Sequence, residues 1–205
     1  MTALLTPGAL LAQTSGACGP YRPTVIEVAP VFQDVDYEFR QPMMKIKEVA
    51  EQASNGAQTE SWPVGLSVGQ LYFRLNTDIY KSRTPNDPAV CAQVKAVHVE
   101  MGFVNNVLYV AREFPKRSCP FKVVLEHEEK HKSVDRQLLD DYAVKAKDVF
   151  ARAAADIGML RNPSGEAIER LINAGLNSAM ESFSAEMNDE RKKRQKEVDT
   201  SEEYA

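Results

Sequence analysis

Two long segments with helical periodicity fill the second half of the chain and constrain its fold more than any other feature. The stretch Ser118–Pro120 supplies a cap and a first-turn proline for a helix that starts near Phe121 and runs to about Gly158. A short turn, Leu160–Pro163, separates it from a second helical segment that runs from about Gly165 into the 190s. Because so short a connection folds the second helix back along the first, we expect an antiparallel helical hairpin.

The first half of the chain shows strand patterns instead. Residues 18–35 are interrupted by proline but rich in β-branched residues, which predicts an extended strand at the edge of a sheet. Residues 43–53 fit a short helix, and 66–80 combine a strand with a short helix. The stretch 81–88 is a turn-rich loop.

Alternation of apolar and polar residues is clearest just before the helical segments. Val90–Phe103 reads as one strand and Val107–Val110 as a second, with Asn105 and Asn106 as the turn between them. The elements together predict an α+β fold, with a small twisted sheet and two long antiparallel helices.

The pattern H-E-x-x-H stands at His127, Glu128 and His131 within the first helical segment. Residues four apart on a helix share a face, so the two imidazoles converge on one point, as the ligands of a metal ion do. In this motif zinc supplies an activated water and the glutamate accepts its proton. We therefore predict Zn²⁺ as cofactor, His127 and His131 as metal ligands, and Glu128 as the catalytic general base.

The charged stretch Glu126–Lys132 also has a plainer interpretation, as a solvated helix face with surface histidines. Against it, the two histidines continue the apolar stripe that includes Val134, Leu138 and Tyr142. We expect both imidazoles to point inward. Outside the motif, His98 lies in a predicted strand and is interpreted as a structural histidine.

A third metal ligand is expected on the second helix. Asp135 lies about 9 Å along the helix axis from the midpoint of the histidines, which is too far for a short side chain. Antiparallel pairing sets His131 opposite Arg191 and His127 opposite Gln195. Near that register our first choice is Glu190. The alternatives are Glu186, Glu197 and Asp199.

Composition and charge exclude some partners. The formal net charge is -4 and no basic stretch stands clear of acids, so a nucleic-acid partner is not expected. No run of about 18 apolar residues exists, so we expect no membrane span. Residues 1–17 carry no charge and are rich in Leu and Ala, which is typical of a signal peptide lacking its basic start. We expect residues 18–200 to form a single domain, 201–205 a tail, and the protein to be periplasmic or secreted.

The chain has three cysteines. In an oxidising compartment Cys91, at the start of a predicted strand, could pair with Cys119, just before the first long helix. Two unpaired thiols are the alternative. If Cys91 pairs with Cys119, Cys18 is left over beside the signal segment. Lipidation of Cys18 is an alternative, but Ser15 stands where the lipoprotein motif usually has Leu, Val or Ile.

On these residues the chain resembles a family of predicted bacterial secreted zinc-dependent proteases, small zincins that carry H-E-x-x-H. The resemblance covers Leu66–Thr200. The features that carry it are the strand with Cys91, the strand Val107–Val110, Cys119, His127 with Glu128 and His131, and the pattern Gln195 to Asp199. The chain departs from the family in having Lys130 where a small residue is common, and it lacks the longer metzincin and thermolysin signatures.

The resemblance implies a zincin-like fold in which the first long helix is the active-site helix. It also implies a peptidase acting on a peptide or protein substrate, with zinc on His127 and His131 and Glu128 as base. A strand bordering the cleft, Val107–Val110, could bind an extended peptide by strand addition. Two other functions stay open. One is a non-catalytic periplasmic interaction protein built on the helical hairpin, and the other is a metal-dependent hydrolase of a non-peptide bond.

Overall fold

The structure, a computed structural model, describes residues 18–53 and 62–199. Over this range it contains three helices and a five-stranded sheet, so the predicted α+β class is confirmed. The predicted signal peptide at 1–17 and the tail at 201–205 lie outside the described residues.

The sheet is organised around one central strand, β4 (Val90–Val110). On one side β3 (Gly65–Arg83) pairs with it antiparallel along nearly its whole length. On the other side three shorter strands follow one another along β4: β5 (Leu160–Asn162) antiparallel, then β1 (Val25–Phe32) and β2 (Asp36–Glu38), both parallel. Both hydrogen-bonding edges of β4 are therefore paired with other strands. β1 is the edge strand predicted around Pro30.

The predicted hairpin between 90–103 and 107–110 is wrong, because β4 runs straight through that turn signal. Asn105 has a positive φ of 52°, and the pairing with β3 shifts register between Val68 and Gln70. Two residues of β4, Asn105 and Asn106, stand opposite one residue of β3, which is a β-bulge. Asparagine tolerates the left-handed conformation that both a turn and a bulge require, so its presence did not distinguish them.

The hairpin lies instead between β3 and β4. β3 is one strand over its full length, so the short helix predicted within 66–80 is wrong as well. The two strands join through residues 84–89, close to the predicted loop at 81–88. The helix predicted at 43–53 is confirmed as α1 (Met43–Ala53).

The helical hairpin is confirmed in its bounds. α2 spans Cys119–Ile157 and begins at the N-cap Ser118, whose side chain accepts a hydrogen bond from the backbone N–H of Phe121. α3 spans Gly165–Val198 and has the same kind of cap. Within the described part of the chain, no helix is both long enough and apolar enough to cross a bilayer.

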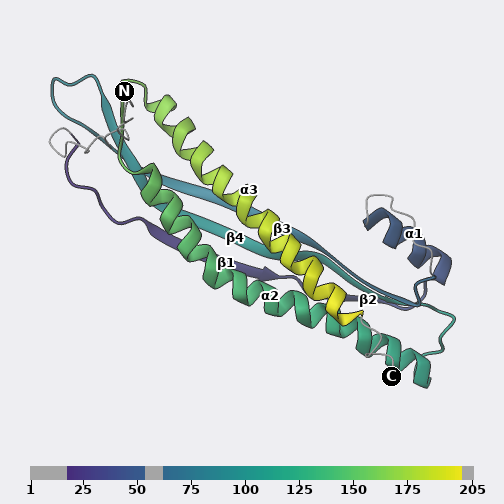
Figure 1. Cartoon of the computed structure of the whole chain (residues 1–205). Coiled ribbons are helices and arrows are strands. Elements are labelled where there is room, and N and C mark those ends of the chain that lie inside the picture. The colour runs from purple at the N-terminus through teal and green to yellow at the C-terminus, as the bar shows by residue number, and fades with distance from the viewer. Residues whose placement is uncertain (1–17, 54–61, 200–205) are drawn as a thin grey trace, which may run out of the picture.

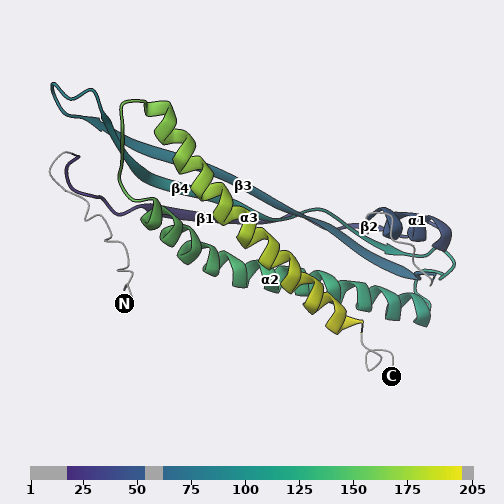
Figure 2. The same ribbon diagram turned by 45° about the horizontal axis from the view of Figure 1, so that its top comes forward.

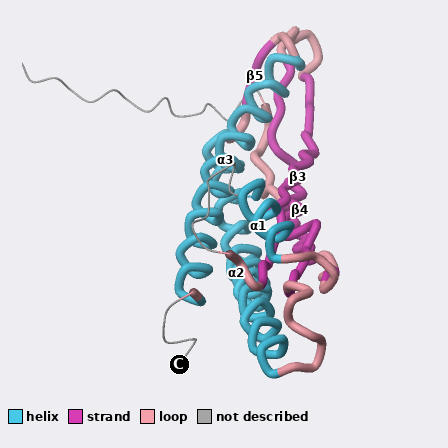
Figure 3. Tube along the Cα trace, turned by 90° about the vertical axis from the view of Figure 1, so that its right-hand side faces the viewer, coloured by secondary structure: helices cyan, strands magenta, loops and turns pink. Residues whose placement is uncertain are grey.

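Both long helices lie on one face of the sheet (Figures 1 and 2), and Figure 3 shows them stacked against it from the side. α2 packs on β4 and β1, and α3 packs on α2 with further contacts to β3. Their apolar stripes and the inner face of the sheet enclose the main core. Its largest fully buried side chains include Phe103, Phe150, Met101, Leu138, Ile168, Ile172, Leu176 and Met187.

The predicted pairing of Cys91 with Cys119 is wrong. Cys91 is bonded to Cys18, with a Cα–Cα distance of 5.4 Å, and Cys119 is an exposed free cysteine. The reason is the length of β4, whose 21 residues extend roughly 70 Å at about 3.3 Å per residue. Cys91 stands at the start of this strand, whereas Cys119 follows its far end.

Candidate metal centre

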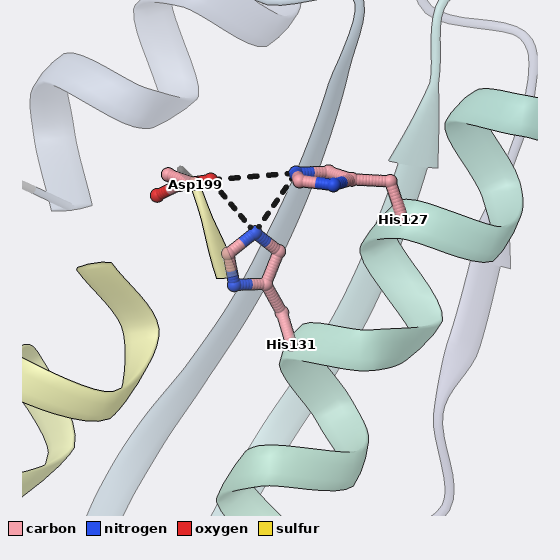
Figure 4. A group of neighbouring side chains, drawn as sticks. All are labelled: His127, His131 and Asp199. Atoms are coloured by element: carbon pink, nitrogen blue, oxygen red, sulfur yellow. Dashed lines mark hydrogen bonds and ion pairs between the residues drawn. The ribbon is translucent and has the colours of Figure 1, made fainter. Parts of the chain in front are cut away.

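Three side chains from two helices meet at one point (Figure 4). The Nε2 atoms of His127 and His131 are 3.2 Å apart. The Oδ1 atom of Asp199 lies 3.3 Å from the first and 3.1 Å from the second. The three atoms thus form a nearly equilateral triangle.

Helix geometry and helix pairing position these groups. His127 and His131 are one turn apart on the face of α2 that meets α3, and Asp199 is the residue that caps the C-terminus of α3. The two helices run antiparallel, so the end of α3 returns to the first half of α2. Gln195 contacts His131, and Arg191 contacts Asp135. Since His131 was predicted to face Arg191, the observed register between the helices differs from the predicted one by about one turn.

The two imidazoles are largely buried, as predicted, whereas the carboxylate is open to solvent. The side chains of His127 and His131 are 10% and 12% exposed, and that of Asp199 is 59% exposed. Burial, followed by the proximity of His131, lowers the pKa of His127 below its ordinary value. A neutral imidazole is the form that binds a metal, so this environment suits a ligand.

A cavity of about 660 Å³ opens directly onto the three groups. One wall comes from α2 and α3 and includes Glu128. The facing wall is the first part of β3, Gly65–Gly69, and Ala50 and Trp62 contribute an apolar side. Trp62 is 57% exposed, and Nζ of Lys47 in α1 lies 5.0 Å from its ring centroid.

Glu128 shares this cavity and is only 6% exposed. Burial, followed by the nearby Asp199 charge, raises the pKa of Glu128 to about 8. A carboxyl group with a pKa in this range can take up and release a proton near neutral pH. The predicted base therefore lies beside the two histidines in an environment suited to proton transfer.

Two glycines of β3 let the strand come close to α2. A Cβ atom on Gly65 would lie 2.6 Å from Oε1 of Glu128, and one on Gly69 would lie 2.5 Å from Oδ1 of Asn106 and 3.1 Å from Nζ of Lys132. Lys132 Nζ donates to the carbonyls of Val68 and of the Asn106 side chain. Burial lowers the pKa of Lys132 to about 8. Sequence patterns did not single out these residues, although the two glycines lie four apart.

Behind His131 lies a buried polar group that the motif alone did not predict. Asp135 is 1% exposed, and its two oxygens accept hydrogen bonds from Arg191 at 2.7 and 2.8 Å. Gln195 bridges Asp135 and His131. Asp135, which helix geometry excluded as a ligand, thus supports the site from one turn away.

The structure does not bring Glu190, the first choice for third ligand, to the histidines. Its Oε1 accepts a hydrogen bond from Arg194 at 2.8 Å, and Arg194 also binds Asp141, ten residues beyond His131 and about 15 Å along the helix. Glu190 lies away from the histidines because the register between α2 and α3 differs by about one turn from the predicted register. Glu186 is likewise engaged with Tyr142 and Lys145. Of the alternatives only Asp199 joins the described cluster, which does not include Glu197.

The expected strand addition at Val107–Val110 is contradicted. Val107 to Tyr109 pair with β2 on one side and with Leu66–Val68 of β3 on the other. No ladder position is left there for a peptide. It is the segment Gly65–Gly69 of β3 that lines the cavity.

Comparison of the chain with family models, with curated proteins and with solved structures gives no match. What the site can do must therefore follow from its own side chains and their geometry.

Proposed function

We propose that the protein is a zinc-dependent hydrolase whose metal is held by His127, His131 and Asp199. The observation that carries the proposal is the triangle of their ligand atoms, with sides of 3.1 to 3.3 Å. Ligand atoms of a tetrahedral zinc site, at about 2.0 to 2.1 Å from the metal, stand about 3.3 Å apart. The donor atoms are thus spaced as zinc requires.

The donor set also favours zinc. Two imidazole nitrogens and one carboxylate oxygen match the three protein ligands of catalytic zinc sites, whereas magnesium and calcium prefer oxygen alone. Three unprotonated acceptors this close repel one another, and a cation or shared protons must offset the repulsion. Three protein ligands would leave a fourth position for water or substrate, and all three residues line the cavity.

The chemistry would follow the motif. Zinc, when bound, lowers the pKa of a water at its open position and polarises a substrate carbonyl. Glu128, with its raised pKa and its place in the same cavity, accepts a proton and returns it to the leaving group. Gly65, pressed against Glu128, limits the positions its carboxylate can take.

A peptide is the substrate we propose. The wall Gly65–Gly69 belongs to a strand whose described strand partner is β4 alone, and an extended peptide can pair with such an edge. Because the carbonyls of Val68 and Gly69 accept hydrogen bonds from Lys132 and Arg191, the peptide would pair with the part of the edge before Val68. The family resemblance noted above implies the same substrate class and a zincin-like arrangement. The Cys18–Cys91 bond supports a periplasmic or secreted location, because disulfides persist in oxidising compartments.

Elemental analysis of the purified chain tests the metal. We expect about one zinc per chain, and its loss in His127→Ala, His131→Ala and Asp199→Ala. Glu190→Ala is the matched control, because it removes an acidic side chain of the same helix that is bound to Arg194. Zinc retained in Asp199→Ala but lost in Glu190→Ala would disprove the ligand set.

Hydrolysis is tested separately with a peptide library. Glu128→Gln should keep its zinc and lose activity by about 10²-fold or more, since it can no longer accept a proton. Wild-type protein that binds zinc but cleaves no peptide would point to a non-peptide substrate. Wild-type protein without zinc would leave the helical hairpin as a binding module.

A further inference from the structure

We propose that Gln195 is a positioning residue that holds the His131 ring with its proton on Nδ1 and its Nε2 lone pair facing the metal. The inference rests on the proposed function, because it assigns to Gln195 a role toward the same metal. It follows from the hydrogen bonds that surround one amide group.

The Gln195 side chain has a partner at each end. Its Nε2 donates to the backbone carbonyl of His131 at 3.1 Å and to Oδ1 of Asp135 at 2.6 Å. Its Oε1 contacts Nδ1 of the His131 ring. The amide therefore holds His131 through both its backbone and its side chain.

Only one orientation of this amide satisfies its partners. A carbonyl oxygen and a carboxylate oxygen accept hydrogen bonds, so both amide hydrogens must face His131 O and Asp135. Turning the amide over would set its oxygen against these two acceptors and lose both hydrogen bonds. Arg191 binds both oxygens of Asp135, which keeps that carboxylate in place as an acceptor.

The tautomer of His131 follows. An amide oxygen can only accept, so the Nδ1 atom that contacts it must carry the hydrogen. In the neutral ring Nε2 then bears the lone pair. That atom lies 3.2 Å from Nε2 of His127 and 3.1 Å from Oδ1 of Asp199, which is where the proposed metal would need it.

The network is anchored on four elements of the fold, which makes it a rigid support. Arg191 also donates to the carbonyl of Gly69 in β3 at 3.1 Å, and its guanidinium lies 4.9 Å from the ring centroid of Phe103 in β4. Asp135 comes from α2 and Gln195 from α3. Outer partners of this kind fix the orientation of ligand histidines in metal sites.

The first measurement is nitrogen NMR of the histidine rings in metal-free wild-type protein at pH 8. The chain has three histidines, so three ring patterns are expected, and His98→Gln helps to assign them. We expect His131 as the Nδ1–H tautomer. If His131 of the wild-type protein is instead the Nε2–H tautomer or an imidazolium, that result alone overturns the proposal.

The second measurement is zinc affinity by competition with a chelator. Gln195→Leu should bind zinc about 10- to 100-fold more weakly and lose the single tautomer. Asn177→Ala, which removes an exposed amide of the same helix, should change neither. Unchanged affinity in a folded Gln195→Leu would overturn the proposal. The expected tautomer in a wild-type protein that binds no zinc would refute the proposed function, and with it the role of Gln195 toward a metal.

Discussion

Gly65 and Glu128 are in such close contact that the strand leaves no room for a side chain at this glycine. An ideal Cβ on Gly65 would stand 2.6 Å from Oε1 of Glu128 and equally close to Cγ1 of Val124. The backbone at the start of β3 therefore presses directly on the carboxylate proposed as the base.

The first prediction is that Gly65→Ala displaces Glu128. The added methyl group should lower stability by about 1 to 3 kcal/mol, as overpacking of a tight contact does, and lower peptide hydrolysis at least tenfold. Zinc content should not change, since no ligand is touched. Gly165→Ala is the control, because its Cβ would meet nothing within 4 Å. Full activity in Gly65→Ala would mean that the contact has no part in positioning Glu128.

The second prediction concerns the pH dependence of stability in the metal-free protein. The pKa of Glu128 is raised to about 8 by folding, so the folded state holds this proton more tightly than the unfolded state. The resulting stability is complete below the ordinary pKa near 4.5 and is lost as the pH rises through about 8. The lowered pKa of Lys132, about 8, adds no slope between pH 5 and 7.

Denaturant unfolding with a chelator present measures this effect. Glu128→Gln should match wild type near pH 5 and exceed its free energy of unfolding at pH 8, by on the order of 3 kcal/mol. The difference between the two proteins isolates Glu128 from other titrating groups. Parallel curves for both proteins would show that the carboxyl group is not held protonated by burial.

The third prediction concerns the buried pair of Asp135 and Arg191. Asp135→Asn removes one partner and leaves the Arg191 charge, whose side chain is 21% exposed, without its carboxylate. The expected loss of stability is about 3 to 5 kcal/mol. Asp189→Asn breaks an exposed pair with Lys192 on the same helix and should cost less than about 1 kcal/mol. Equal melting temperatures for the two variants would contradict the structural role of Asp135.

The fourth prediction concerns the disulfide. Cys18 and Cys91 are 73 residues apart, and closing a loop of this length should stabilise the protein by roughly 4 kcal/mol. Cys18→Ser should lose about that much, whereas Cys119→Ser should lose almost nothing. Zinc content should be the same in both, because Cys91 lies at the end of β4 opposite to the candidate metal centre. A large effect of Cys119→Ser alone would favour the pairing first expected from the sequence.

Local sequence signals predicted the helices well. The bounds of α1, α2 and α3 were expected from caps, proline, glycine and apolar spacing, all of which act within a turn or two of the helix end. The turn predicted at Asn105 and Asn106 is wrong, because a residue in the left-handed conformation also occurs in a β-bulge within a long strand. Whether a chain turns or continues there depends on the strand beside it.

The sequence by itself determined that His127, Glu128 and His131 share one region of a helix, because a spacing of four residues is a property of the helix alone. It also determined that two helices fold back on each other. Only the tertiary structure decided that Asp199, and not Glu190, meets the histidines, and that Gln195, Asp135 and Arg191 support them. The physical reason is that the register between two helices depends on the packing of their whole faces. It also depends on how β5, which connects the two helices, pairs with β4. A shift of one turn, about 5.4 Å, exchanges every partner while leaving each helix unchanged.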